Sequence, residues 1–550
     1  MRAPKRRWFV AFILIAVIAA CSGGGGGGGT TAPSTTYTVT YYGNGNTGGN
    51  VPVDSNTYQQ GQRATVLANT GNLVRTGFTF DGWNTQANGS GASYMPYSSC
   101  QMGTANVTLY AQWTVNGAGG YTVTYVANGG TGTVPIDSNS YVTGETVTVP
   151  ANSGSLTYPG YAFVGWQTKA DGSGATYRGG GTFTMGSANT TLYALWAGGY
   201  AYTVNWSDST VSQYTIGPNG ALTPMFTPAV TTTGYDPRWL TVDTSGRYLY
   251  VSNNYGSSPI SGCNYSGCGN IAQFTIGADG SLSTLPTSTF VPSGPAPAGG
   301  AVHPTKPWYY VTTGWSNISQ NIINADGSLT SMATSTVFGG QFDDSITIDP
   351  SGKWAYVANG DNNTVRQYMI DQISGELSPM ATPSVATGRN AYDIAIVSIS
   401  SVEYAYVANY DDGTISQYKI DSISGMLTSM GTATASPGGN TLSIAVDPLG
   451  RFAYAPINAS QSAVIAQFQI NQTTGALESN GTVSAAQGMA NWIAIESSGK
   501  YAYATSGDNG AIGTTISQYT IDQTTGALTL MSNPSVQTGF SPSQIVTVGK

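Results

Sequence analysis

The chain has 550 residues, only 8% of them charged, and a formal net charge of -8 at pH 7. This length exceeds what one hydrophobic core normally holds, so more than one domain is expected. Gly (73) and Tyr (35) are abundant, which favours short strands joined by tight turns over helices. Because no Lys/Arg cluster follows residue 7, the chain offers no surface that would neutralise phosphates, and we expect no nucleic-acid partner.

The chain begins with the pattern of an export signal: four basic residues precede an apolar run from Trp8 to Ile18 that is too short to span a bilayer as a helix. Ile18-Ala19-Ala20-Cys21 resembles a bacterial lipobox. The resemblance implies a lipoprotein signal peptide over residues 1–20 and lipidation of Cys21. The alternative is an ordinary signal peptide with a Cys near its cleavage site.

Ser22 follows Cys21, where bacterial lipoproteins that stay in the inner membrane often carry Asp. The resemblance therefore implies attachment to the outer membrane by a lipid anchor, with the folded part periplasmic or exposed at the surface. Residues 21–36 include seven consecutive glycines and read as a flexible tether.

Three further cysteines lie beyond the tether. Cys263 and Cys268 are close enough in sequence to form a disulfide across one long loop, whereas a zinc site would need two more ligands, which this chain hardly offers. Cys100 is interpreted as a buried free thiol, since no His lies near it in sequence. No metal and no cofactor is predicted.

Residues 37–114 and 121–197 are two copies of one module. Shared elements include Gly-Phe-Thr-Phe-Asp-Gly-Trp83 and Gly-Tyr-Ala-Phe-Val-Gly-Trp166, a Gly-Ser-Gly turn, and a Leu-Tyr-Ala-x-Trp strand. Both segments resemble the Listeria-Bacteroides repeat, which implies a small β-grasp-like domain. We interpret Trp83 and Trp166 as core anchors rather than sugar-stacking residues, and the pair of modules as a stalk. An adhesion role is the alternative.

From residue 199 to residue 550 a different unit recurs, marked by Tyr-x-Tyr in the second strand. The column holds Tyr202, Tyr250, Tyr310, Tyr356, Tyr406, Tyr454 and Tyr503. Each unit contains an apolar strand, the Tyr strand, a strand of the type Ile-Ser-Gln-Tyr-x-Ile and an outer strand after a Gly-x-Leu turn. Seven units of four strands at this spacing predict an all-β chain that ends in a seven-bladed β-propeller.

The ends of this region favour a closed ring over a solenoid. The region opens with a second-strand sequence, Tyr200 to Asn205, and closes with a lone first strand, Gln544 to Val548. One blade would therefore be shared between the two ends, which removes exposed sheet edges.

The repeat unit, for example Asp349-Pro-Ser-Gly-Lys-Trp-Ala-Tyr356-Val-Ala-Asn359, resembles the seven-bladed lactonase-like propellers, a superfamily that includes 6-phosphogluconolactonase and the Tyr-Val-Thr-Asn repeat surface proteins. The resemblance implies the fold over about 350 residues. A lactonase of this type is expected to use His, Glu and Arg in the central channel, whereas the matching residues here are blade scaffolding.

The only histidine, His303, stands in a column that other units fill with Asp243, Asp349, Asp447 and Glu496. A short polar side chain at this place caps the turn between the first and second strands, so we interpret His303 as structural. No catalytic residue is assigned, and the sequence leans away from an enzyme. Asp-Gly pairs such as Asp279-Gly280 and Asp412-Gly413 are interpreted as hairpin turns rather than calcium loops.

A ligand site is predicted where the loops that enter each first strand meet the loops that leave each second strand, because both sets emerge on one face. These loops also carry Asp236, Trp206 and Trp315. Asp344, Arg389 and Asp393 form the preferred trio near the axis, with Arg389 and Asp393 as weak catalytic candidates. The further ligand-binding candidates are Asn440, Asn491 and Trp492.

The sequence thus predicts a lipid-anchored envelope protein whose propeller binds a carbohydrate, peptide or protein ligand without catalysis. The first alternative is a lactone hydrolase of the 6-phosphogluconolactonase-like family. The second is a structural scaffold for other envelope proteins.

Overall fold

A computed structural model describes residues 35–76, 78–115, 120–256, 269–285, 297–313, 316–340, 343–459, 462–507 and 513–549. These residues form strands and turns and no helix. They fall into two units, 1–120 and 121–550, and each is described by itself. The predicted all-β fold class is confirmed.

The first module, in the first unit, has a mixed four-stranded sheet in the order β2-β8-β5-β6 and two small two-stranded sheets, β1-β3 and β4-β7. β2 and β8 pair in parallel. The strands are β1 (Thr36–Tyr37), β2 (Val39–Tyr42), β3 (Tyr58–Gln59), β4 (Arg63–Thr65), β5 (Phe78–Asn84), β6 (Ser93–Tyr94), β7 (Ser99–Gln101) and β8 (Val107–Val115).

The second module repeats this plan in the sheet β12-β11-β14-β9, with β10-β13 beside it. The strands are β9 (Val123–Val126), β10 (Thr146–Thr148), β11 (Ala162–Gln167), β12 (Thr176–Tyr177), β13 (Thr182–Thr184) and β14 (Thr190–Ala197). Trp83 and Trp166 are 1% and 0% exposed, and their indole N–H groups donate to the carbonyls of Leu67 and Pro150. Both tryptophans are therefore core anchors, as predicted.

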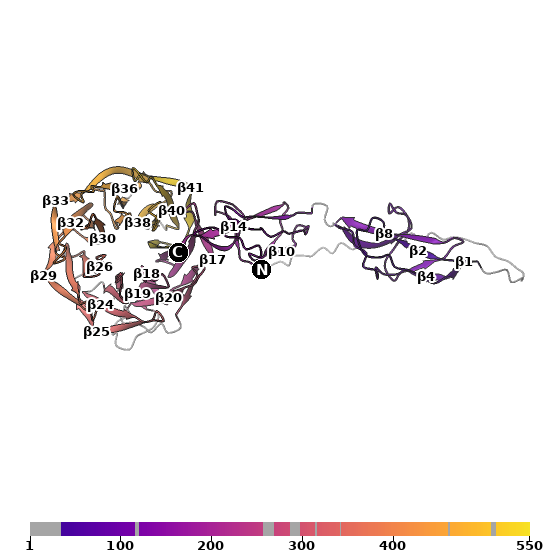
Figure 1. Ribbon diagram of the computed structural model, residues 1–550, viewed down its shortest axis with the longest axis horizontal. Helices are drawn as coiled ribbons and strands as arrows, with labels where there is room; N and C mark the ends of the chain where they lie inside the picture. The colour runs from indigo at the N-terminus through magenta and orange to yellow at the C-terminus, as the bar shows by residue number, and fades with distance from the viewer. Residues whose placement is uncertain are drawn as a thin grey trace, which may run out of the picture. The chain divides into compact units, whose positions relative to one another are not determined.

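The remaining strands form seven four-stranded sheets arranged around one axis (Figure 1). Blade 1 is β42-β15-β16-β17, and blades 2 to 7 use β18 to β41 in chain order. The strands of blade 1 are β15 (Gly199–Asn205), β16 (Thr210–Ile216), β17 (Leu222–Thr231) and β42 (Pro542–Gly549). Because β42 pairs with β15, the C-terminal strand closes the ring, and the predicted split blade is confirmed.

Blades 2 to 4 comprise β18 (Gly234–Val242), β19 (Tyr248–Gly256), β20 (Asn270–Ile276), β21 (Leu282–Thr284), β22 (Pro297–Val302), β23 (Trp308–Thr313), β24 (Asn317–Ile323), β25 (Leu329–Phe338), β26 (Asp343–Ile348), β27 (Trp354–Asn359), β28 (Thr364–Ile370) and β29 (Leu377–Ala386). Blades 5 to 7 comprise β30 (Ala391–Ile399), β31 (Val402–Asn409), β32 (Thr414–Ile420), β33 (Leu427–Ala435), β34 (Ala445–Val446), β35 (Phe452–Ala459), β36 (Ser462–Ile470), β37 (Leu477–Ser484), β38 (Met489–Ile495), β39 (Tyr501–Gly507), β40 (Thr515–Ile521) and β41 (Leu528–Gln537).

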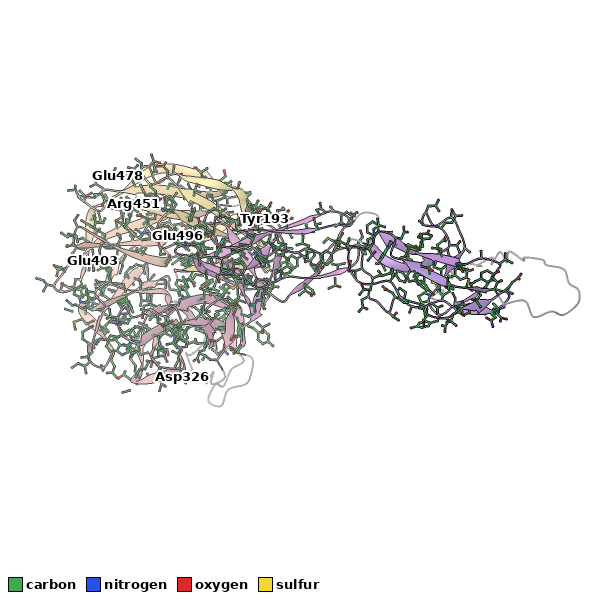
Figure 2. All side chains as sticks on the ribbon, turned by 45° about the vertical axis from the view of Figure 1, so that its right-hand side comes forward. Tyr193, Asp326, Glu403, Arg451, Glu478 and Glu496 are labelled. Atoms are coloured by element: carbon green, nitrogen blue, oxygen red, sulfur yellow. The ribbon has the colours of Figure 1, made fainter. Side chains whose placement is uncertain are left out.

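Each blade exposes loops on two faces of the ring. We call the face with the loops that enter first strands and leave second strands the loop face, and the opposite face the turn face. Arg451 and Glu496, labelled in Figure 2, follow first strands and so belong to the turn face.

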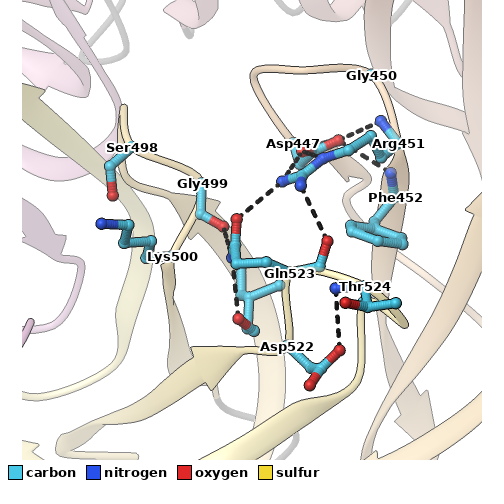
Figure 3. A network of polar contacts seen from close by, with 12 residues as sticks. Asp447, Gly450, Arg451, Phe452, Ser498, Gly499, Lys500, Asp522, Gln523 and Thr524 are labelled. Carbon is cyan, nitrogen blue, oxygen red and sulfur yellow. Dashed lines mark hydrogen bonds and ion pairs between the residues drawn. The ribbon is translucent and has the colours of Figure 1, made fainter.

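At the turn face, one arginine joins two neighbouring blades. Arg451 of blade 6 pairs with Asp447 at 2.8 Å and donates to the backbone carbonyl and side-chain oxygen of Gln523 in blade 7 (Figure 3). The Gln523 amide donates in turn to the carbonyl of Gly499. Because Arg451 is the part of this joint that reaches between blades, its charge serves ring assembly.

Candidate ligand site at the loop face of the propeller

The first strands are irregular where they approach the loop face. In six of the seven blades the ladder between the first and second strands has a register shift there. The seventh, β34, is only two residues long. A bulge re-aims side chains and interrupts pairing, so this end of each first strand is free to carry residues that differ from blade to blade.

One polar cluster lies at the bulge of β18. Arg238 forms an ion pair with Asp236 at 3.1 Å, and its guanidinium lies 4.6 Å from the ring centroid of Trp206 in blade 1. Asn254 donates to the same Asp236 carboxylate at 2.7 Å. Trp206 is 38% exposed and the Arg238 side chain 43%. The cluster therefore presents an aromatic ring and a cation to solvent.

A pair of tryptophans begins one residue after Arg238 in the sequence. Trp239 of blade 2 and Trp492 of blade 7 contact each other edge to face, with ring centroids 4.9 Å apart. The Trp239 indole also donates to the carbonyl of Gly300 in blade 3 at 3.1 Å. Trp492 is a predicted site residue, whereas sequence reasoning missed Trp239 and Arg238. Trp239 stands in the same column as Trp492, and this match is the signal that could have found Trp239.

Asp393 is buried between three blades. Its carboxylate accepts hydrogen bonds from the backbone N–H of Ile394, from Ser345 of blade 4 and from the N–H of Ile444 in blade 6. Burial raises the pKa of Asp393 to about 6, although these three hydrogen bonds oppose the rise. Asp393 therefore joins the inner strands, and its oxygens are occupied by donors of the protein.

Arg389 lies in an exposed loop and makes different contacts. Its Nε is 2.6 Å from Asp412, and the Arg389 side chain is 67% exposed. The hydrogen bond and charge of Asp412 raise the pKa of the guanidinium. Arg389 and Asp393, two members of the preferred trio, thus have separate partners. The third, Asp344, lies in β26 between the paired residues Asp343 and Ser345, at a register shift, and its side chain is outside the described set.

The other predicted residues are distributed around the loop face. Asn440 and Asn491 are half-buried, and the backbone carbonyl of Asn491 accepts from the Ser443 hydroxyl at 3.5 Å. Cys21, Cys263, Cys268 and Trp315 lie outside the described residues. Cys100 lies within the described residues and is a buried free thiol, as predicted.

His303 has the capping role that its column predicts. The ring is fully buried, Nδ1 accepts from the backbone N–H groups of Thr305 and Lys306, and Nε2 lies 2.8 Å from the carbonyl of Gly352 in blade 4. Burial lowers the pKa of His303, which favours the neutral ring that this pattern requires. Asp349 holds the equivalent turn of blade 4 by accepting from the N–H groups of Lys353 and Trp354.

Two wider properties bear on what the site can hold. Among the described residues, no group of three or more His, Cys, Asp and Glu side chains is arranged to hold a metal ion. The part of the chain with described coordinates contains no helix long and apolar enough to cross a membrane.

Comparison with known families matches both parts of the chain. The profile described as "Lactonase, 7-bladed beta-propeller" matches residues 264–444 and 452–549, about half of the chain. The profile of the Listeria-Bacteroides repeat domain matches residues 37–112 and 121–195. Both resemblances seen in the sequence are confirmed.

Solved structures show the same propeller at low sequence identity. The periplasmic gluconolactonase of Pseudomonas aeruginosa aligns with a TM-score of 0.53 and 16% identity, over 64% of this chain and 99% of that protein. A protein of Bacteroides uniformis, provisionally described as a 6-phosphogluconolactonase, gives the same TM-score, identity and coverage. At such identity the likeness shows the fold alone.

A curated relative from Evansella cellulosilytica, provisionally named a Gly-rich membrane protein, is 41% identical over 165 residues, which is 29% of this chain. A second protein of that organism, provisionally named a membrane protein, is 38% identical over 122 residues, or 22% of this chain. The matched segments span only 18% and 16% of these relatives.

Proposed function

The chain belongs to the lactonase family of seven-bladed β-propellers, and we propose on this premise that its propeller binds a carbohydrate ligand at the loop face without hydrolysing it. The observation that carries the proposal is the solvent-accessible cluster of Trp206, Arg238 and Asp236. An aromatic face with polar groups beside it is a common arrangement for fixing a sugar ring. Arg238 keeps N–H groups that could reach a sugar hydroxyl or carboxylate.

The contacts of the titratable groups favour binding over turnover. A general base has to reach the proton that it removes. His303 is used in a turn, Arg389 is held by Asp412, and the carboxylate of Asp393 accepts three hydrogen bonds from the protein. None of these groups is both reachable and chemically free in this conformation.

We further propose that the protein is exported and tethered to the outer membrane through lipidated Cys21. The lipobox-like sequence and Ser22 support this location, and the provisional names of the two partial relatives support attachment to a membrane without saying which one. The second candidate function is lactone hydrolysis, which the name of the family favours. It would require Asp393 to become accessible, since its pKa of about 6 suits acid–base chemistry near neutral pH.

One set of experiments separates these functions. Mature protein is screened by thermal shift against sugars, sugar acids, sugar lactones and peptidoglycan fragments, and lactone consumption is followed by NMR. A ligand at about 100 times its dissociation constant should stabilise the fold by about 2.7 kcal/mol. Binding that is lost in Arg238→Ala, with no lactone consumed above the spontaneous rate, supports the proposal.

Arg366→Ala is the matched control, because Arg366 also lies over an aromatic ring, 4.7 Å from the centroid of Phe338. Its binding should equal that of the wild type. Lactone turnover abolished by Asp393→Asn would replace the proposal with hydrolysis. A blank screen with a stoichiometric protein partner in pull-downs would instead indicate a scaffold.

A further inference from the structure

The second module is joined to the propeller without a spacer. β14 ends at Ala197 and β15 begins at Gly199, and the N–H of the one intervening residue, Gly198, donates to the carbonyl of Ile216 in blade 1 at 2.8 Å. Here the last strand of the module continues into the blade through which the ring closes.

Side chains of the second module pack on the outer part of that blade. Val164 packs against an apolar cluster of the propeller that includes Tyr200 and Met225. A Cβ added at Gly165 would lie 2.8 Å from the ring of Phe226, so the module and β17 are in close contact. The hydroxyl of Thr223 donates to the carbonyl of Gly172 at a buried position, 3.1 Å away.

The same module also reaches the next blade. Arg178 lies 4.7 Å from the ring centroid of Phe226 in blade 1 and pairs at 3.1 Å with Asp279 in blade 2. Blade 1 and blade 2 therefore both contact one module.

The two copies of the module differ at the positions that make this contact. Where the second module has Val164, Arg178 and Leu195, the first has Asp81, Met95 and Gln112. Asp81 is exposed, and Met95 is 68% exposed. On the propeller side, Phe226 stands where blades 3 and 4 carry Ala333 and Ala381. Both partners thus depart from their own repeats at this interface.

We propose that the second module is a clasp that holds blade 1 together and so keeps the propeller closed. Blade 1 is the only blade built from both ends of the propeller, so its β15–β42 pairing is not secured by a turn within the chain. A body that continues into β15 and is fixed to β17 and to blade 2 limits the movement of β15 away from its neighbours. At the matching positions the first module carries the exposed residues Asp81 and Met95, so it lacks the residues that make this interface.

The test uses the mature full chain and amide hydrogen exchange. The variant Arg178→Met/Phe226→Ala replaces each interface residue with the one that its own repeat carries elsewhere. We expect exchange in β15 and β42 to become at least tenfold faster, while β31 and β32 of blade 5 stay unchanged. Met95→Ala, at the matched position of the first module, should alter neither pair of strands.

If the double variant does not fold, Phe226→Ala alone is measured in the same way, since the Ala of blades 3 and 4 is compatible with an intact blade. Unchanged exchange in β15 and β42, despite faster exchange in β12 and β17, would overturn the proposal, because the module would then dock on blade 1 without stabilising the β15–β42 pairing. An equal acceleration in all blades would overturn it as well, because the effect would then be general destabilisation.

Discussion

At the turn face of the propeller, every blade is joined to the next by the same two hydrogen bonds, whereas one position of the inner strands at the loop face carries five residue types in seven blades. The first bond runs from the Tyr-x-Tyr column to the glycine carbonyl of the next outer turn. The seven pairs are Tyr202–Gly280, Tyr250–Gly327, Tyr310–Gly375, Tyr356–Gly425, Tyr406–Gly475, Tyr454–Gly526 and Tyr503–Gly220.

The second bond runs from a leucine N–H to the glutamine of the third strand in the preceding blade. The seven pairs are Leu282–Gln213, Leu329–Gln273, Leu377–Gln320, Leu427–Gln367, Leu477–Gln417, Leu528–Gln467 and Leu222–Gln518.

At the loop face, by contrast, the residues at one position of the inner strands are Trp239, Gly299, Ser345, Asp393, Ser443, Trp492 and Gln544. The difference teaches that repetition marks the joints between blades, and that the candidate site lies where repetition ends.

Removal of Ser543 to Lys550 should have the largest effect, because it deletes β42 and leaves β15 as an open edge. It also removes Gln544, whose side chain accepts from the N–H of Leu240 in blade 2 at 2.6 Å. We expect the melting temperature to fall by about 10 °C or more in calorimetry. Removal of Lys550 alone is the control, and an unchanged melt after the longer deletion would contradict the closed ring.

Gly425→Ala tests a single joint of the turn face. Gly425 has φ +71°, and an added Cβ would lie 2.4 Å from the indole of Trp354 in the preceding blade. Strain and displacement of the ring should cost about 3 kcal/mol in urea unfolding. Gly431→Ala, where an added Cβ meets nothing within 4 Å, should change stability by less than about 0.5 kcal/mol. Equal effects at both glycines would refute this account of the joint.

The repeated half of this comparison could be predicted from the sequence. Seven tyrosines, the Ile-Ser-Gln-Tyr strands and the Gly-x-Leu turns recur because each makes the same contact in each blade, so their spacing carries the fold. His303 could be placed as a turn cap for the same reason. Where a residue differs from those at the equivalent position in other blades, the sequence shows that its contact differs but not what the new contact is.

The candidate site could be predicted only in outline. The sequence placed Asp236 and Trp492 in loops, whereas they lie at the loop-face ends of β18 and β38. The contact of Trp239 with Trp492 spans blade 1 and depends on ring closure. Arg238 pairs with Asp236 because a register shift turns the strand, and one sequence shows no signal for such a shift. The docking of the second module depends on Phe226, which reads as an ordinary strand residue.

Asp393→Asn tests the loop face through pH. The pKa of Asp393 in the folded state, about 6, lies above its ordinary value of 3.8 because the carboxyl is buried. Its contribution to stability is therefore fully present below about pH 3.8 and is lost as pH rises through about 6. A rise of about two pKa units corresponds to about 3 kcal/mol.

The measurement is the difference in unfolding free energy between wild type and Asp393→Asn at pH 4.5 and pH 8. Subtracting the wild-type value from that of the variant cancels groups whose effect on stability changes with pH in the opposite direction. Asp279 is one such group: burial raises its pKa, but hydrogen bonds from Ser281 and the charge of Arg178 lower it further, so its pKa is lowered overall. The variant should gain on the wild type as pH rises. A difference that does not change with pH for Asp393→Asn would contradict the assignment.

Tyr356→Phe should have the smallest effect and sharpens the comparison most. The Tyr356 hydroxyl donates to the buried carbonyl of Gly425 at 2.5 Å, so the variant leaves one acceptor unpaired at a cost of about 1–2 kcal/mol. Combined with Gly425→Ala, it should cost less than the sum of the two changes, because both act on one joint. Combined with Arg238→Ala at the loop face, it should be additive within about 0.5 kcal/mol. The double variant Tyr356→Phe/Gly425→Ala is measured by urea unfolding. If its cost equals the sum of the two single changes, Tyr356 and the turn at Gly425 do not form one joint, and the repeated tyrosine stabilises its own blade instead.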